Sequence, residues 1–466
     1  MNFLRLSCAL VAAGALGSAA LADSARVRVV HASPDAPAVD VLVDGAVAFG
    51  DLAFNEATGY ASLPAGTYDV QVTPAGLNEI VVIDASLALD GGVDYTVVAI
   101  GELASIAPLV LIDDNALEPS AARIRFVHAS PDAPAVDIAL ANGGPVLFGN
   151  VSFGESGGYI AVPGGSYDLE VRLAGTMIPV LGLPGIAVEN NTVYTAFATG
   201  FAAGDPALGA LLLVDSRTAR VRAIHASPDA PAVDVLVDGA PAITSLAFTQ
   251  ASTYLQLPPD EYDFAVTPAG VPGIAVISAS VALDSGTDYS IVAIGELASI
   301  APLVLIDDNT LDPENARIRF VHASPDAPAV DIALADGGPV LFGNIAFTEV
   351  GDYLAVPGGT YDLEVRVAGT GTVVLPLPGI AVESDTVYTV LAMGFAFGKP
   401  GLEAVIVVDN VGAGKPGNAD LDGNGVVDSA DLGILLGNWG RAGAGDLDGN
   451  GVVDGADLGL LLSSWT

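Results

Sequence analysis

The sequence has little of the chemistry that usually crosslinks or activates an exported protein. It contains one cysteine, Cys8, four histidines, and 15 basic against 55 acidic residues, for a net charge of −40. Without disulfides, each domain must be held together by its own apolar core. The strong acidity argues against nucleic acid and anionic membrane surfaces as partners, and it fits cation binding or the solubility of an apolar β protein.

Long hydrophobic runs are also absent, apart from one at the N-terminus. Residues 1–22 contain a basic residue, Arg5, followed by an apolar run and then small residues, which predicts a secretory signal peptide cleaved after Ala22. Cys8 precedes most of that run, so we expect no lipidation. No later stretch is long enough to cross a bilayer. We therefore expect a secreted protein, extracellular or associated with the cell surface, with no membrane span.

The body of the chain is built on one ten-residue motif, HASPDAPAVD. The motif begins at His31, His128, His225 and His322, always 97 residues apart, and these are the only histidines. This period is much longer than that of solenoid repeats, so it predicts separate domains rather than stacked turns. The repeats are assigned to residues 23–122, 123–219, 220–316 and 317–410.

The repeats alternate between two types. The first and third share GELASIAPLVLIDDN, at 101–115 and 295–309, whereas the second and fourth share RIRFVHASPDAPAVDIALA. A two-repeat unit has therefore been duplicated. Within each repeat, segments such as 63–72, 94–101 and 107–114 are rich in Val, Ile, Tyr and Thr and are bounded by turn residues, which predicts β-strands.

The tyrosines support an immunoglobulin-like arrangement. Each repeat has three, which are Tyr60, Tyr68 and Tyr95 in the first. The segment before Tyr95 is typical of a tyrosine corner, in which the hydroxyl bonds to upstream backbone. We expect a mainly β protein with four tandem immunoglobulin-like Greek-key β-sandwich repeats. Core packing is the favoured role of all twelve tyrosines, and a sugar-stacking platform is the alternative.

The motif and its spacing resemble a bacterial secreted domain catalogued as a domain of unknown function, family 4397. The resemblance covers about 390 residues. It implies a β-sandwich fold and no activity.

The polar residues of the motif could suggest catalysis or metal binding. His31, Ser33 and Asp35 lie within five residues, whereas a catalytic triad normally converges from separate elements. A zinc site needs three or four ligands, and each repeat has one histidine and no cysteine. We favour a structural role, in which His31 ends the first strand and bonds to the Pro-Asp turn, and Asp40 starts the next strand. Cation or ligand contact remains the alternative.

The composition changes after Asn410. Residues 411–419 form a Gly/Pro linker, and two copies of DLDGNGVVD follow in a predicted domain at 420–466. Their spacing matches the twelve-residue calcium loop, with oxygen ligands at positions 1, 3, 5, 7, 9 and 12 and glycine at position 6. The predicted ligands of two calcium ions are Asp420, Asp422, Asn424, the Val426 carbonyl, Asp428 and Asp431, and Asp446, Asp448, Asn450, the Val452 carbonyl, Asp454 and Asp457.

Each loop is followed by an apolar pattern that predicts one helix. Leu432, Leu435, Leu436 and Trp439 recur at helical spacing. Leu458, Leu461, Leu462 and Trp465 repeat the pattern 26 residues later. We expect a small all-α module in which the two stripes, with both tryptophans, pack against each other.

Two loop-helix units in tandem resemble a type I dockerin. The resemblance implies calcium-dependent folding and docking to a cohesin partner. Dockerins often carry Ser-Thr at loop positions 10 and 11, where this chain has Ser429-Ala430 and Gly455-Ala456. A surface-sorting or self-anchoring role is therefore an alternative to cohesin docking.

Taken together, the sequence predicts a non-catalytic modular protein with no catalytic residues. The β repeats would serve as spacer, adhesion or ligand-binding modules, with polysaccharide as a candidate ligand. Residues 420–466 would bind a cohesin-like or cell-surface protein. The alternative is a hydrolytic enzyme subunit of a dockerin-assembled surface complex that degrades polysaccharide, with its chemistry at the His/Asp turn.

Overall fold

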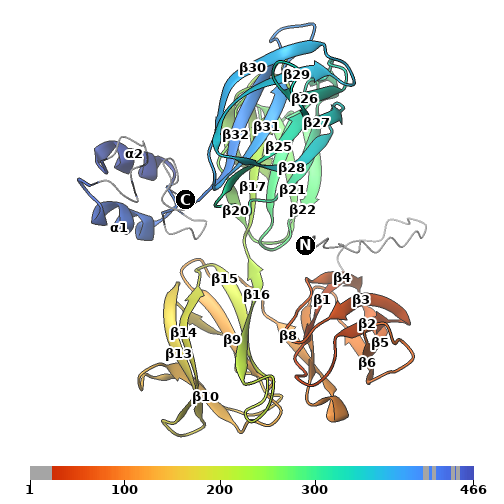
Figure 1. Ribbon diagram of the computed structural model, residues 1–466, viewed down its shortest axis with the longest axis vertical. Coiled ribbons are helices and arrows are strands. Elements are labelled where there is room, and N and C mark those ends of the chain that lie inside the picture. The colour runs from red at the N-terminus through yellow and green to blue at the C-terminus, as the bar shows by residue number, and fades with distance from the viewer. Residues whose placement is uncertain are drawn as a thin grey trace. The chain divides into compact units, whose positions relative to one another are not determined.

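A computed structural model describes residues 24–412, 419–421, 427–441, 445, 447 and 452–465 (Figure 1). The predicted signal peptide and Cys8 lie outside these residues. The described chain is mainly β, with eight four-stranded sheets and two helices at the C-terminal end. None of its helices has the length and apolar character needed to cross a membrane.

The first repeat contains two sheets. Its strands are β1 Ser24–His31, β2 Val39–Val43, β3 Ala46–Leu52, β4 Ala61–Pro64, β5 Gly66–Pro74, β6 Ile83–Leu89, β7 Asp94–Ile100 and β8 Ala107–Asp113. One sheet has the order β4-β1-β7-β8 and the other β3-β2-β5-β6. The pair β1–β7 is parallel, and the other strand pairs of this repeat are antiparallel.

The segment 63–72, expected to be one strand, is divided between the two sheets. Strand β4 ends at Pro64 and β5 begins at Gly66. β4 pairs with β1, whereas β5 pairs with β2 and β6. The single-strand interpretation is therefore wrong, because the Pro-Ala-Gly sequence redirects the chain from one sheet to the other. The strands expected at 94–101 and 107–114 are present as β7 and β8.

The same pair of sheets recurs three more times in the chain. The second repeat has β9 Ala122–His128, β10 Val136–Leu140, β11 Val146–Val151, β12 Ile160–Val162, β13 Gly165–Leu173, β14 Pro179–Val188, β15 Thr192–Thr199 and β16 Gly209–Arg217. The third has β17 Ala219–His225, β18 Val233–Val237, β19 Ala240–Leu246, β20 Leu255–Leu257, β21 Glu261–Pro268, β22 Ile277–Ala282, β23 Asp288–Ile294 and β24 Ala301–Asp307. The fourth has β25 Asn315–His322, β26 Val330–Leu334, β27 Val340–Ile345, β28 Val350–Pro357, β29 Gly359–Val367, β30 Val373–Val382, β31 Thr386–Met393 and β32 Glu403–Val411.

The two sheets of each repeat bury apolar side chains between them. In the first repeat, Val29 of β1 clusters with Val41 of β2 and Val72 of β5. Side chains alternate between the faces of a strand, so Arg28 and Val30 point to the other side of β1. That outer face is also buried, with Arg28 3% and Val30 0% exposed.

The outer face is buried because repeats pack in pairs. The chain divides after Ser216 into two compact units, each holding two repeats. In the first unit, Val30 and Val98 of repeat 1 join Val127 and Phe197 of repeat 2 in one buried cluster. In the second unit, an equivalent cluster joins repeats 3 and 4. Each repeat has its own core, as expected, but an additional apolar layer connects the two members of a pair.

The C-terminal segment has two short helices, α1 Ser429–Gly437 and α2 Gly455–Ser463. They share a small core with Leu435 and Leu461 at its centre, both 0% exposed. The expectation of two fully packed stripes is wrong, because each helix ends before its tryptophan. The side chains left outside the core are Leu436 (50% exposed), Trp439 (45%), Leu462 (53%) and Trp465 (42%).

Candidate functional site

The histidine of each motif is buried and connects two ends of its own loop. His31 ends β1, and its Nε2 lies 2.9 Å from the carbonyl oxygen of Pro37. Because that oxygen can only accept, Nε2 carries the proton and Nδ1 is the acceptor. The backbone N–H of Ser33 donates to Nδ1 at 3.3 Å. The edge of the ring faces Phe54 at a centroid distance of 6.4 Å.

The remaining polar residues of the motif bind backbone groups. The Ser33 hydroxyl donates to the Gly101 carbonyl at 2.6 Å, and Asp35 accepts from the Leu103 N–H at 2.7 Å. Asp40 accepts from two backbone N–H groups, those of Asp51 and Gly76, each at 2.8 Å. The motif therefore ties the β1–β2 loop to the β7–β8 connection, the end of β3 and the β5–β6 turn.

The contact between the histidine and a proline carbonyl recurs in the other repeats. The imidazole Nε2 atoms of His128, His225 and His322 lie 3.1, 2.9 and 3.1 Å from the carbonyls of residues 134, 231 and 328. Burial lowers the pKa of all four histidines below the ordinary value of 6.5, although the bond to the proline carbonyl opposes this shift. Each histidine is therefore held in its neutral form.

The motif does not assemble a hydrolytic triad. The Ser33 hydroxyl donates to Gly101 rather than to the imidazole, and the Asp35 carboxylate accepts from backbone 68 residues further along the chain. Among the residues that the structure describes, no group of three or more His, Cys, Asp or Glu is placed to hold a metal ion. The contacts agree with a structural role for the motif. The prediction was wrong in detail, because the His31 imidazole bonds to the Pro37 carbonyl rather than to the Pro34-Asp35 turn, and β2 begins at Val39 rather than at Asp40.

Replacing His31 with alanine is expected to destabilise the first unit. The change removes a buried ring and leaves the Pro37 carbonyl without its donor, which should lower the free energy of unfolding by about 2–4 kcal/mol. Thermal unfolding of the full chain measures the effect. His31→Gln is the matched control, because its amide can still donate to Pro37. An alanine variant as stable as the original protein would contradict the structural role.

The neutral histidines also predict sensitivity to mild acid. The unfolded imidazole binds a proton near pH 6.5, whereas the folded imidazole binds it only at lower pH. The unfolded state therefore holds more protons below pH 6.5, and the free energy of unfolding falls as the pH decreases. Each histidine contributes a slope of at most about 1.4 kcal/mol per pH unit.

Melting temperatures between pH 7.5 and pH 5 test this prediction. The non-titrating His31→Gln variant should show a shallower pH dependence for the unit that contains residue 31, with no change in the other unit. Identical profiles for the variant and the original protein would contradict it.

A buried charge network joins the two repeats of the first unit. The Arg28 guanidinium forms an ion pair with Asp215 of repeat 2, and the Arg125 guanidinium forms one with Asp113 of repeat 1. The carboxylate side chains are 0% exposed and the arginine side chains 3% and 4%. The two ion pairs are reciprocal, so each repeat supplies one cation and one anion to its partner.

Hydroxyl groups complete the network. Arg28 Nε donates to Thr96 Oγ1 at 2.8 Å, and Thr96 in turn donates to Asp113 at 2.6 Å. The Tyr60 hydroxyl donates to the same Asp113 oxygen at 2.6 Å, and its ring lies 4.9 Å from the Arg28 guanidinium carbon. Burial raises the pKa of Asp215, and Arg28 opposes this rise. The charges are thus paired in a site from which water is excluded.

The second unit contains the same arrangement. Arg222 pairs with Asp409, Arg319 pairs with Asp307, and the Tyr254 ring lies 4.7 Å from the Arg222 guanidinium carbon. Sequence reasoning missed this network. The available signal was an arginine between apolar residues in the first strand of every repeat, at positions 28, 125, 222 and 319.

The twelve tyrosines have three structural roles. In each repeat one lies against the buried arginines, as Tyr60 does. A second, Tyr68, donates to a carbonyl four residues upstream. The third, Tyr95, accepts from the N–H of Asp90 at 3.1 Å, so its hydroxyl bonds to upstream backbone as expected for the corner. The equivalents of Tyr95 are Tyr194, Tyr289 and Tyr388.

The predicted calcium loops are described only in part. Asp422, Asn424, Val426, Asp446, Asp448 and Asn450 lie outside the described residues. Asp420, Asp428 and Asp454 are half-buried, and Val452 is exposed. Asp428 also caps α1, since its carboxylate accepts from the Ala430 N–H at 2.7 Å.

The carboxylates at position 12 have matching environments. Asp431 and Asp457 are both 0% exposed. Asp431 accepts from the N–H of Leu421 at 2.6 Å and of Asp428 at 2.8 Å. Asp457 accepts from the equivalent groups ten and three residues upstream, each at 2.7 Å. Each carboxylate therefore connects the beginning and end of its loop to the following helix.

These contacts fit a loop that encloses a hard cation. Burying a carboxylate is costly, and a bound cation would offset that cost. The oxygen-rich loop sequence provides the ligand chemistry that calcium requires. Asp431 and Asp457 would hold one ion each, together with the remaining loop ligands.

Comparison with known proteins identifies the repeats. One solved structure, titled "The Bacillus anthracis TIE protein", matches 76% of this chain with 10% identity and a TM-score of 0.17, and this chain spans 65% of its length. No curated protein matches. The family described as Domain of unknown function (DUF4397) matches at residues 25–139, 122–221, 219–333 and 333–423. The chain therefore belongs to this family, with four tandem matches to its domain.

Proposed function

We propose that this is a secreted, non-catalytic modular protein whose β repeats act as spacer, adhesion or ligand-binding modules. Its C-terminal segment is a calcium-dependent, dockerin-like anchor for a cohesin-type or cell-surface partner. Each sheet pair is an immunoglobulin-like Greek-key sandwich, which the tyrosine corner supports. The polar side chains of the motif form hydrogen bonds with backbone groups, and this favours a non-catalytic role.

One observation carries the anchoring proposal. The two halves of the C-terminal segment leave matching apolar side chains outside their shared core, Leu436 and Trp439 in one half and Leu462 and Trp465 in the other. Exposed aromatic and leucine side chains are costly in water and typical of binding surfaces. Their positions differ by 26 residues, the spacing of the loops, so the two halves present similar surfaces.

Binding to immobilised type I cohesin, with calcium or with chelator, tests the anchor. The full chain should bind only with calcium, and the Trp439→Ala/Trp465→Ala variant should bind at least tenfold more weakly. Circular dichroism in calcium shows whether this variant keeps its helices. If the full chain folds with calcium but does not bind cohesin, cohesin docking is excluded.

Cell fractionation tests whether the C-terminal segment retains the protein at the cell envelope, by docking or by sorting. A chain truncated after residue 412 should be lost from the cell envelope if the C-terminal segment is an anchor. If full and truncated chains fractionate identically, the segment does not anchor the protein.

The enzymatic alternative has its own test. Activity on polysaccharide, ester or peptide substrates that disappears when all four histidines are replaced by glutamine would overturn the non-catalytic proposal. The glutamine variants preserve the donor to the proline carbonyl, so folding and chemistry can be separated.

A further inference from the structure

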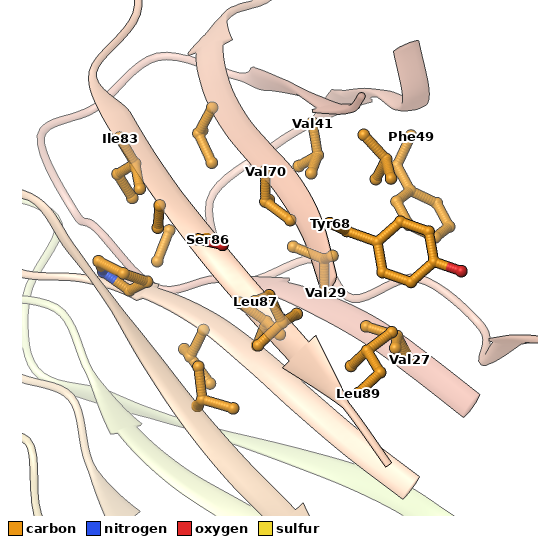
Figure 2. Close-up of a pocket in the computed structure, with 18 of the residues that line it drawn as sticks. Val27, Val29, Val41, Phe49, Tyr68, Val70, Ile83, Ser86, Leu87 and Leu89 are labelled. Carbon is orange, nitrogen blue, oxygen red and sulfur yellow. The ribbon is translucent and has the colours of Figure 1, made fainter. Parts of the chain in front are cut away.

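The first repeat has an apolar cavity between its two sheets, and Figure 2 shows side chains that line it. The cavity volume is ≈140 Å³. Its lining includes Val29, Val41, Val70 and Leu87, and the only lining side chains with a polar group are those of Tyr68 and Ser86. The Tyr68 hydroxyl is bonded to the Pro64 carbonyl, and Ser86 is exposed. The space is therefore suited to an uncharged, apolar occupant.

The cavity divides the core of this repeat. One buried cluster surrounds Val41 and Val72, and a separate one contains Val27 and Leu89. In repeat 3, the equivalent residues form a single cluster, and the equivalent cavity measures only ≈20 Å³. Two copies of the same fold therefore differ in how completely the space between their sheets is filled.

One residue difference between repeats 1 and 3 explains why the cavity is filled in repeat 3. Val70 lies opposite Val43 and Ala85 on the neighbouring strands, and Phe264 of repeat 3 has the equivalent partners Val237 and Ala279. Phe264 is 4% exposed and contacts the Tyr262 ring at a centroid distance of 6.4 Å. Its ring joins the two halves of the core, whereas Val70 is too short to do so.

Two edge strands line the cavity on one side of the repeat. Strands β6 and β8 are edge strands of different sheets. Leu87 of β6 and Pro108 and Val110 of β8 all line the cavity, and Val110 is 43% exposed. A molecule entering between these two edges would not have to break the hydrogen bonds within either sheet.

We propose that repeat 1 binds one uncharged apolar group of about six to eight carbon atoms, a ring or a short alkyl chain, inserted between β6 and β8. An apolar cavity of about 150 Å³ is large enough to hold benzene or xenon. The equivalent position in repeat 3 is closed by Phe264. This site is independent of the C-terminal anchor.

Calorimetry on the full chain tests the proposal with two probes. Toluene represents a free small molecule, and octyl glucoside below its micelle concentration represents an alkyl chain whose head group stays in solvent. Binding of one equivalent of toluene supports a free ligand, and binding of one equivalent of octyl glucoside supports a chain end. Binding of neither probe overturns the proposal.

Two reciprocal variants locate the site. Val70→Phe copies the residue of repeat 3 and should weaken binding at least tenfold. Phe264→Val copies repeat 1 and should add a second equivalent of ligand. Thermal unfolding shows whether each variant folds. If Val70→Phe does not fold, the number of ligand equivalents bound by Phe264→Val decides whether the site is correctly assigned. Unchanged binding in folded Val70→Phe, or no second equivalent in folded Phe264→Val, would overturn the assignment.

Discussion

Replacing Arg28 with alanine is expected to lower the free energy of unfolding of the first unit by about 3–5 kcal/mol. The substitution leaves the Asp215 carboxylate, which is 0% exposed, without its guanidinium partner. It also removes the donor to Thr96 and the cation beside the Tyr60 ring. Because Asp215 lies in the second repeat, both repeats of the unit should unfold at a lower temperature.

The neighbouring Arg26 provides a matched control. Its side chain pairs with Asp94 but is 33% exposed, so Arg26→Ala should cost less than about 1 kcal/mol. Arg222→Ala should destabilise the second unit and leave the first unchanged. Calorimetric scans of the full chain report both units. An Arg28→Ala variant no less stable than Arg26→Ala would contradict the importance of the network.

A double variant distinguishes the cost of the unpaired charge from the cost of disturbing the network's other hydrogen bonds. Arg28→Met together with Asp215→Leu replaces the pair with apolar side chains, and it should recover much of the stability lost in Arg28→Ala. A double variant as unstable as Arg28→Ala would show that the remaining hydrogen bonds of the network, rather than the unpaired charge, dominate its energy.

The local part of the fold could be predicted from the sequence. Enrichment in Val, Ile, Tyr and Thr between turn residues identified strands such as β7 and β8, and the motif spacing identified four repeats. The parallel pairing of β1 with β7 could not be predicted, because it joins segments about 68 residues apart and local patterns contain no information on such pairing. The division between β4 and β5 depended on the same long-range choice of sheet.

The packing of repeats in pairs was harder to foresee. Val27 and Arg28 are adjacent, yet one points into the core of its own repeat and the other into the interface with the next. A strand with both faces buried looks like an ordinary apolar strand in the sequence. The duplication of a two-repeat unit in the sequence is consistent with this pairing. Only the ion pairs of Asp113 and Asp215 show which surfaces of the two repeats are in contact.

The C-terminal segment shows the limit of helical patterns. The periodicity correctly placed Leu435 and Leu461 in the core. It also extended each stripe to a tryptophan, whereas α1 ends at Gly437 and α2 at Ser463. Two nine-residue helices offer too little buried surface for all eight apolar positions, so the last residues of each stripe remain exposed.

Removal of calcium is expected to unfold the C-terminal segment while both β units remain folded. Two short helices with a six-residue buried core are marginal by themselves. Binding to the folded state adds about 2.7 kcal/mol per site when calcium exceeds its dissociation constant a hundredfold. Chelation should remove that contribution and release the buried carboxylates of Asp431 and Asp457 into water.

Tryptophan fluorescence isolates this transition, because Trp439 and Trp465 are the only tryptophans of the chain. Calcium titration of the full chain should change their emission with a stoichiometry of two ions. Asp431→Asn and Asp457→Asn should each weaken one site, because the amide cannot supply two anionic oxygens. Asp90→Asn, in an exposed turn of repeat 1, is the control. If emission and helical content are the same in calcium and in chelator, the loops do not fold around calcium and the anchor must be explained without it.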